Sequence, residues 1–301
     1  MASRITSTGS YAPKRIATNA VLREHNPAIN PEWTERVLGI SERRYIVPTQ
    51  TVSQLATKAG QTALAKHLHH RDLELIIVAS TTPDQTGVSV ASYVQQHLGH
   101  TPNDCPAFDI NAVCSGFVYG LIIAHQINAK HALIIGADTF SKITDWTNRD
   151  CVFFGDGAGA VVLSASDYGG ILGYDWGSQT GPGWYVSDGF WQMDSKAVFA
   201  AAMKYLPQSI EKALKVAGMG LDDIDHVIPH QASLNLLKSL AGQTGLDFDK
   251  FKTSLWRYGN TAGASVPLTL DKHADNIKPG DKVLLTSIGA GWTWASVVLE
   301  W

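Results

Sequence analysis

The chain repeats a pattern of helices and strands at an offset of 150 residues, and this repeat constrains its fold more than any other feature. An apolar run at 74–78 follows an alanine-rich helical stretch, and a run at 225–228 follows a similar stretch. Farther along, the apolar run at 131–135 matches the run at 281–285 with the same offset. Short, bounded apolar runs predict buried strands, so the shared offset indicates one structural unit used twice.

Between the two strand-like runs of each half, a turn of small residues opens an apolar helix. The first turn covers 111–116 and the second covers 260–265. An offset of 150 places Ala264 opposite Cys114. The two turns therefore predict a pair of equivalent central helices, one in each half.

Each half ends with a glycine-rich turn and a last apolar strand, at 154–163 and at 288–299. The glycines at 155–159 do not fit a dinucleotide-binding fingerprint, because that motif opens a helix and here a strand follows. Apolar strands separated by helices predict sheets that are covered on both faces. We therefore expect an α/β fold of two halves, 1–165 and 166–301, stacked as five layers, α/β/α/β/α, with the central helices between the sheets.

Composition narrows the classes of partner. Of the 301 residues 17% are charged, and the net charge is −3. This charge gives no broad attraction for nucleic acid or an anionic membrane, and no apolar run approaches the roughly 18 residues of a membrane span. The low charge suggests that surface is hidden against a partner subunit. A polar N-terminus and three cysteines without C-x-x-C spacing predict a cytoplasmic protein.

Cys114 lies where a predicted strand gives way to the apolar helix of the first half. A thiol at a helix N-terminus faces unpaired N–H groups and the positive end of the helix dipole, and both favour the thiolate. A buried structural cysteine is the ordinary alternative, and Cys105 and Cys151 keep that interpretation. Ser115 and Gly116 are small enough to let a ligand approach, so Cys114 is the candidate nucleophile.

Two further side chains are candidates for the same site. His230 follows the strand-like run 227–229, and α/β proteins present ligand-facing groups at the C-terminal ends of strands. Asn260 begins the second small-residue turn, as a helix cap or as an amide aimed at developing negative charge. Because the repeat makes its helix the counterpart of the helix that carries Cys114, we expect Asn260 to lie near the thiol.

Two other motifs contain residues that could bind a metal or an oxyanion. His67, His69 and His70 look like a metal cluster, but they lie among charged residues at the polar end of a predicted helix, so we expect no metal site. The backbone N–H groups of 289–291 are better placed, since they could complete an oxyanion hole.

These residues together resemble the β-ketoacyl-acyl carrier protein synthase III family, acyltransferases with the thiolase fold, over essentially the whole chain. The resemblance lies in 9–11, 109–116, 154–160, 230–232, 259–261 and 292–294. It implies that acyl-coenzyme A loads Cys114 as a thioester and that a malonyl thioester on acyl carrier protein then enters. His230 and Asn260 would bind the malonyl carbonyl as an enolate forms on decarboxylation, with the N–H groups of Cys114 and Ala290 as the oxyanion hole. It also implies a homodimer, and no cofactor besides the coenzyme A thioester substrate.

The same resemblance implies substrate contacts. Trp33 and Arg149 correspond to the pair that sandwiches the adenine of coenzyme A, through stacking and cation–π contact. Gly87 stands where bacterial members place a Phe that crosses the dimer interface and limits acyl length. The segment between Ala160 and His230, which covers the acyl site, is also short. We therefore expect an acyl donor longer or bulkier than acetyl, in fatty acid or related lipid or secondary-metabolite biosynthesis.

Besides Gly87, three further positions depart from the family pattern. Ser233 and Asn235 replace Asn and Arg after the histidine, and the Arg is associated with carrier-protein docking, so docking by acyl carrier protein stays open. Ala290 replaces the central glycine of three. Alanine keeps the N–H group but disfavours positive φ, so the oxyanion hole requires an unstrained residue there.

Three alternative functions fit the sequence less well than condensation. An acyltransferase of the same fold that forms an ester or amide needs no enolate stabiliser, which argues against it because Asn260 is present. A non-catalytic partner subunit would not need the set of Cys114, His230 and Asn260. A cysteine hydrolase fits poorly, because no carboxylate motif lies near His230.

Overall fold

The computed structural model describes residues 2–65, 72–99, 105–187 and 189–301, and two sheets form its frame. The first sheet has the order β1-β7-β6-β4-β5 and the second has the order β11-β12-β13-β8. The first consists of β1 (Ala2–Tyr11), β7 (Asp156–Ser166), β6 (His131–Thr139), β4 (Leu75–Ala79) and β5 (Ala107–Ile110). The second consists of β11 (His226–Pro229), β12 (Lys282–Gly289), β13 (Thr293–Glu300) and β8 (Gly170–Ser178).

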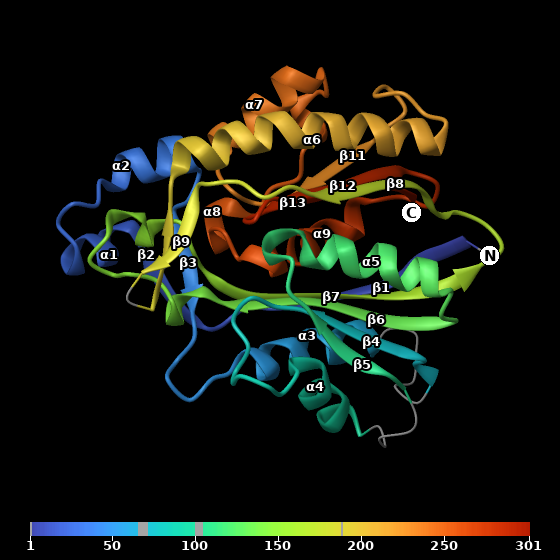
Figure 1. The fold of residues 1–301 in the computed structure, drawn as a ribbon, viewed down its shortest axis with the longest axis horizontal. Helices are drawn as coiled ribbons and strands as arrows, with labels where there is room; N and C mark the ends of the chain where they lie inside the picture. Colours follow the sequence, from blue (N-terminus) through green and yellow to red (C-terminus); the bar gives the residue numbers. More distant parts are fainter. Residues whose placement is uncertain (1, 66–71, 100–104, 188) are drawn as a thin grey trace.

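Helices cover both faces of each sheet, as Figure 1 shows. The outer face of the first sheet carries α3 (Val52–Leu64) and α4 (Val90–Leu98), and that of the second carries α6 (Ser195–Ala217) and α7 (Leu234–Thr244). Between the sheets lie α5 (Gly116–Ile127) and α9 (Ser265–His273). The expected α/β/α/β/α layering of the thiolase fold is therefore confirmed.

Shorter elements complete the chain. Two small antiparallel sheets of two strands each are formed by β2 (Arg15–Thr18) with β3 (Glu42–Tyr45) and by β9 (Trp184–Ser187) with β10 (Phe190–Met193). The short α-helices are α1 (Asn19–His25), α2 (Pro31–Trp33) and α8 (Leu255–Tyr258), and η1 (Thr34–Leu38) is a π-helix. Single 3₁₀ turns are η3 (Val113–Ser115), η4 (Phe140–Lys142), η5 (Arg149–Val152), η6 (Phe248–Lys250), η7 (Ala262–Ala264) and η8 (Ala274–Asn276).

The strand register confirms the internal repeat. In the first half Val78 of β4 pairs with Ile135 of β6, and in the second half Ile228 of β11 pairs with Leu285 of β12. Both pairs are parallel, and both join residues 57 positions apart. The offset of 150 therefore holds for these two pairs of parallel strands.

At the two central turns the offset is 149, which corrects the expected pairing of Cys114 with Ala264. Val113 opens η3 and Ala262 opens η7, and both residues have a positive φ, 49° and 48°. Cys114, second in its turn, therefore corresponds to Gly263. The reason is that the path from the central turn to the following strand is one residue longer in the second half, with 22 positions from Gly263 to Leu285 against 21 from Cys114 to Ile135.

The central helices are packed tightly against both sheets. Helix α5 is apolar nearly all round, as expected of a helix without a solvent face. Gly136 of β6 lets η7 lie directly on the strand, since a Cβ at this position would stand 2.1 Å from the carbonyl oxygen of Gly263.

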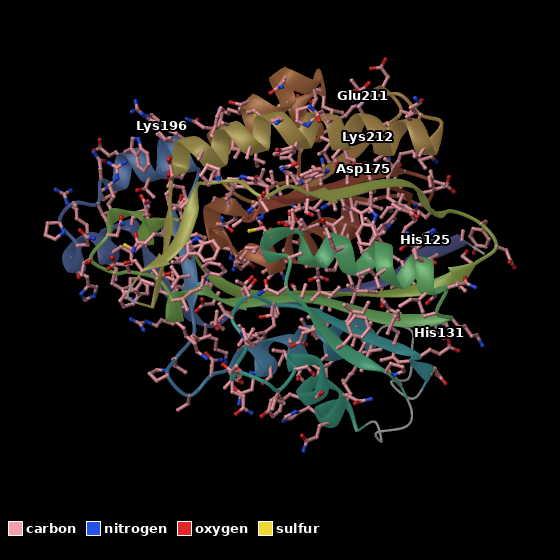
Figure 2. All side chains as sticks on the ribbon, in the orientation of Figure 1. His125, His131, Asp175, Lys196, Glu211 and Lys212 are labelled. Atoms are coloured by element: carbon pink, nitrogen blue, oxygen red, sulfur yellow. The ribbon has the colours of Figure 1, made fainter. Side chains whose placement is uncertain are left out.

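The outer helix α6 is also tied to its sheet by charge. Its Lys212 forms an ion pair with Asp175 of β8 at 3.8 Å (Figure 2).

The sheets fall on either side of the expected boundary between 1–165 and 166–301, with β7 ending at Ser166. The division into two domains itself stays a prediction. Within the described residues, no helix is long and apolar enough to span a membrane.

Candidate active site

Cys114 lies in η3, one turn before α5, rather than in the α-helix itself. The turn is held by the second half: Ser287 donates its hydroxyl to the carbonyl oxygen of Cys114 at 2.7 Å, and Ser115 donates to the carbonyl of Thr293 at 2.7 Å. Val113, with its φ of 49°, adopts the left-handed region that non-glycine residues rarely occupy. Such strain clusters at functional sites, where the surrounding structure enforces it.

The environment of the Cys114 thiol opposes its ionisation. Burial raises its pKa above the ordinary value, and the negative charge of Asp138 raises it further. The sequence-based expectation that the helix terminus favours the thiolate is therefore outweighed by loss of water. Nucleophilic attack by this thiol needs a neighbouring base.

His230 is the base in reach of the cavity. It lies just after β11 and is only 7% exposed, and burial lowers its pKa to about 4. Its Nδ1 atom forms a hydrogen bond of 2.6 Å with the hydroxyl of Ser265, the first residue of α9. The imidazole is therefore neutral at physiological pH, and Ser265 fixes the ring so that Nε2 is the nitrogen available to a reacting group.

Asn260 is held by both its backbone and its side chain. Its amide oxygen accepts a hydrogen bond from the N–H of Ala262 at 2.9 Å, and its backbone exchanges hydrogen bonds with Phe153 and Gly155. The oxygen is occupied within the turn, which leaves the NH₂ group as the donor toward the cavity that Asn260 lines. Asn111 makes the equivalent bond to Val113 in the first half, at 3.4 Å.

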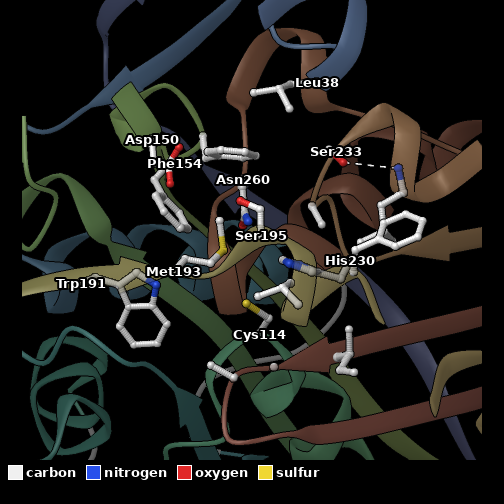
Figure 3. A pocket seen from close by; sticks show the side chains of 18 of the residues that line it. Leu38, Cys114, Asp150, Phe154, Trp191, Met193, Ser195, His230, Ser233 and Asn260 are labelled. Atoms are coloured by element: carbon white, nitrogen blue, oxygen red, sulfur yellow. Dashed lines mark hydrogen bonds between the residues drawn. The ribbon is translucent and has the colours of Figure 1, made fainter. Parts of the chain in front are cut away.

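The structure brings Cys114, His230 and Asn260 to one cavity of about 260 Å³. Figure 3 shows the three side chains converging on the same space. Neighbouring aromatic and apolar side chains form the wall beside the thiol: Phe140, Phe153, Phe154, Trp191, Met193 and Trp292. The site is thus a thiol, a neutral imidazole and an amide donor in an apolar surround.

The loop between β12 and β13 lies against the thiol turn. A Cβ on Gly289 would stand 3.0 Å from the backbone nitrogen of Cys114, so glycine is required for this approach. Ala290 lines the cavity and is not among the residues with positive φ, whereas Gly291 has a φ of 95°. An oxyanion hole with alanine at 290 requires that this residue has no positive φ. The structure meets this requirement, because the positive φ falls on Gly291.

Trp33 and Arg149, predicted as an adenine-binding pair, lie together at the cavity. The guanidinium carbon of Arg149 is 5.6 Å from the centre of the Trp33 ring system. The two groups touch one another, so an adenine can enter between them only after Arg149 moves. Its side chain is 69% exposed, which leaves room for that movement.

The other two residues predicted to contact the substrate, Ser233 and Gly87, lie in different places. Ser233 lines the cavity, where its hydroxyl also caps α7 by accepting from the N–H of Leu236 at 3.3 Å. Gly87 lies in an exposed loop and does not line this cavity. Its φ of 89° is positive, and a Cβ there would meet nothing within 4 Å.

Four residues that contribute to the site were not identified from the sequence. Ser265 was seen only as part of a small-residue turn, although its place at the start of a helix could have indicated a partner for His230. Trp191 and Met193 come from β10, a hairpin strand that gave no clear periodic signal. Asp138 is an acidic residue in an otherwise apolar strand, which was a signal for a special role.

No group of three potential metal-ligating side chains occurs among the described residues. The histidine cluster His67, His69 and His70 lies outside that part of the chain.

Comparisons with known proteins agree with this geometry. The family model described as 3-oxoacyl-[acyl-carrier-protein] synthase III matches residues 108–180, and its C-terminal counterpart matches residues 214–301. A relative from Thiobacillus denitrificans named beta-ketoacyl-[acyl-carrier-protein] synthase III is 40% identical, with 99% of each chain covered. The chain belongs to the β-ketoacyl-acyl carrier protein synthase III family.

Solved structures place this family member within the thiolase fold. A 3-oxoacyl-[acyl-carrier-protein] synthase III from Aquifex aeolicus has a TM-score of 0.94 and 34% identity, covering 99% of this chain and 100% of that chain. The priming β-ketosynthase of the R1128 polyketide pathway has a TM-score of 0.93 and 27% identity, with 99% and 96% covered. The protein is therefore a condensing enzyme of the acyltransferase class, as the sequence motifs predict.

Proposed function

We propose that this synthase joins an acyl group from acyl-coenzyme A to a malonyl thioester on acyl carrier protein, in two half-reactions at Cys114. The observation that carries the proposal is the meeting of Cys114, His230 and Asn260 in one cavity of a family member. Cys114 supplies the nucleophile, His230 the base, and His230 together with Asn260 the donors to the enolate oxygen. No cofactor is needed, because the thioesters supply the activated carbon atoms.

In the loading step the sulfur of Cys114 attacks the thioester carbonyl of acyl-coenzyme A. The thiol proton passes to the neutral imidazole of His230 as the new carbon–sulfur bond forms, because neither group ionises usefully alone at neutral pH. The N–H groups of Cys114 and Ala290 stabilise the oxyanion. The coenzyme A thiolate leaves and takes up the proton, and the acyl group stays on sulfur.

In the condensing step the malonyl thioester replaces coenzyme A. His230 and Asn260 donate hydrogen bonds to its carbonyl oxygen as the carboxylate leaves as carbon dioxide and an enolate forms. The enolate carbon attacks the carbonyl of the acyl-cysteine, the bond from that carbonyl to sulfur breaks, and the β-ketoacyl thioester leaves. The Cys114 thiolate then takes up a proton from solvent to regenerate the thiol. An ester-forming or amide-forming acyltransferase would not use this second pair of donors, so release of carbon dioxide from the malonyl thioester tests the proposal.

The pH dependence of loading follows from the burial of His230. Its pKa is lowered to about 4, so the basic form that accepts the thiol proton dominates above that pH and is lost below it. We expect single-turnover loading to fall with an apparent pKa near 4. The measurement is a stopped-time mass assay across pH, with circular dichroism to exclude acid unfolding. An apparent pKa near 6.5 would show that the imidazole is solvated in the working enzyme.

The aromatic wall beside Cys114 supports an acyl donor longer or bulkier than acetyl. Phe140 is buried and stacks on Phe154 with ring centres 4.6 Å apart, and Trp191 meets Phe140 edge-on at 5.7 Å. A dry apolar wall is matched by apolar surface on the substrate. The short segment before His230 still reaches the site, because β10 places Trp191 and Met193 on the cavity.

Trp191 is then the side chain that sets the upper length of the acyl group. Trp191→Ala should shift loading toward longer acyl-coenzyme A donors, with roughly fourfold higher kcat/KM for each added methylene that finds room, from about 0.8 kcal/mol of burial. Intact-mass analysis with a chain-length series measures this shift. Trp256→Ala is the control, because Trp256 is 55% exposed and lies outside the cavity. An unchanged length preference in Trp191→Ala would contradict the assignment. Gly87→Phe is a poorer probe, since its φ of 89° strains any side chain.

The assembly and the location complete the proposal. A homodimer is supported by β5, which is the terminal strand of its sheet, and by the exposed loop that carries Gly87. A cytoplasmic location is supported by the cysteines, none of which forms a disulfide in the described part of the chain. Docking of acyl carrier protein is supported by the family, whereas Asn235 lacks the charge that the family places there.

A further inference from the structure

Asp138 is a fully buried carboxylate that the two half-reactions do not use. It lies near the end of β6 and is 0% exposed. One oxygen, Oδ1, accepts hydrogen bonds from the backbone N–H groups of Thr81 and Thr82, at 2.8 and 3.2 Å, and from the hydroxyls of Thr82 and Ser80, at 3.0 and 3.4 Å. These donors all come from the loop after β4 in the first half.

The other oxygen of Asp138 crosses to the second half of the molecule. Oδ2 accepts a hydrogen bond of 2.9 Å from the N–H of Gly263, which lies 125 positions away in η7. The approach is close, because a Cβ at Gly263 would stand 3.0 Å from the same oxygen and 3.3 Å from the carbonyl oxygen of Val113, so an alanine here would have to push its neighbours back. The carboxylate therefore clamps the second central turn against the first sheet, next to the turn that carries Cys114.

The internal repeat relates the backbone N–H of Gly263 to an N–H group of the first half. Gly263 is the counterpart of Cys114, and each follows a residue with the same strained φ, Ala262 and Val113. In the first half the equivalent N–H is the one proposed to bind the substrate oxyanion. In the second half the protein supplies the anion itself, in the form of Asp138, and so uses an anion-binding turn as an internal anchor.

The anchored turn carries Asn260. The N–H of Ala262 is bound by the Asn260 amide oxygen and the N–H of the next residue is bound by Asp138, so both donors that define the turn are occupied. A left-handed alanine persists only where its surroundings hold it. Without the carboxylate, the strained turn can relax and turn the Asn260 NH₂ group away from the cavity.

We propose that Asp138 is a positioning residue for the condensing step, acting through Gly263 to aim Asn260 at the malonyl carbonyl. The inference rests on the proposed function. Asp138 has a second, separable effect. Burial raises the pKa of its carboxyl group to about 7, and above that pH its negative charge acts on the Cys114 thiol and opposes formation of the thiolate. The other titratable or charged side chains that line the cavity are His230, Arg149 and Asp150. Loss of Asp138 therefore weakens condensation while making the cysteine more reactive.

The decisive experiment measures the two half-reactions separately in Asp138→Asn. Condensation of the pre-acylated enzyme with malonyl-acyl carrier protein should fall about 100-fold, the cost of a misplaced catalytic group, whereas loading by acyl-coenzyme A should change by less than about threefold. Alkylation of Cys114 by iodoacetamide at pH 7.5 should become faster. Equal losses in both half-reactions, or no loss in condensation, would overturn the proposal.

Asp156→Asn is the matched control. Asp156 is also 0% exposed and accepts hydrogen bonds from the N–H groups of Ile46 and Ser141, neither of which belongs to the Asn260 turn. Its replacement should affect stability without separating the half-reactions. A split of the same size in this variant would show that any lost buried carboxylate has this effect, and the assignment to Asp138 would fail.

Gly263→Ala tests the same contact with the charge kept. The added Cβ displaces the carboxylate, so condensation should fall while alkylation of Cys114 stays near the native rate. If neither variant folds, hydrogen exchange in the native enzyme decides: the Gly263 amide should be strongly protected, and rapid exchange would refute the anchor. Wild-type enzyme that neither loads nor condenses would instead refute the proposed function, which distinguishes the two failures.

Discussion

Cys114→Ala should abolish loading and condensation, by on the order of 10⁶-fold when measured as turnover, because Cys114 supplies the thiol of the cavity and its sulfur carries the acyl group. Decarboxylation of the malonyl thioester should persist in part, since His230 and Asn260 remain in place. Intact-mass analysis after incubation with acyl-coenzyme A measures loading, and release of labelled carbon dioxide measures decarboxylation. The variant should fold, because a cysteine and an alanine differ little in size.

The two other cysteines provide matched controls for this experiment. Cys105 and Cys151 are buried at 2% exposure each, and burial raises the pKa of Cys151 to about 11. Cys105→Ala and Cys151→Ala should still gain the mass of one acyl group. An acylated Cys114→Ala protein would place the nucleophile elsewhere and contradict the mechanism.

Asn260→Ala should slow condensation by about 10²–10³-fold, the usual cost of removing one donor to developing negative charge. Loading should change much less, because the proposed oxyanion hole for the acyl-enzyme uses the N–H groups of Cys114 and Ala290 instead. Asn260→Asp sharpens the test, since it keeps the shape and the bond to the Ala262 N–H but replaces the donor with a negative charge. Rates of each half-reaction on the same preparation give an internal control for folding.

The result that would contradict this prediction is a parallel loss. If Asn260→Ala slows loading and condensation equally, the amide serves the turn alone and not the enolate. If Asn260→Asp condenses at the native rate, a donor at this position is not required at all. Either outcome would also remove the reason for favouring decarboxylative condensation over simple acyl transfer to an alcohol or amine.

Much of the fold could be predicted from the sequence because its signals are local and repeated. The apolar runs at 74–78 and 225–228 are strands in matching sheets, and the apolar helix after Cys114 is buried because it has no polar face. Each candidate side chain also stands at a recognisable local break, between a strand and a helix or at the start of a turn. A duplicated unit then brings equivalent breaks together, which is why Asn260 could be expected beside Cys114.

The exact partners of those side chains were decided by packing between remote segments. The sequence does not show that Ser265 holds His230, that Asp138 reaches Gly263, or that the strained position beside Ala290 falls on Gly291. The change in the sequence offset from 150 to 149 at the central turns could not be predicted either. The extra residue lies between the second central turn and β12, in a loop without a periodic pattern of apolar residues.

The sequence by itself therefore determined the duplicated α/β architecture, the family, and the identities of Cys114, His230 and Asn260 as candidates. Only the tertiary structure decided their chemistry. Burial, more than the helix terminus, sets the pKa of the Cys114 thiol, and burial also keeps His230 neutral. The physical reason is that a pKa depends on the water and charge around a group, and those are supplied by segments distant in the chain.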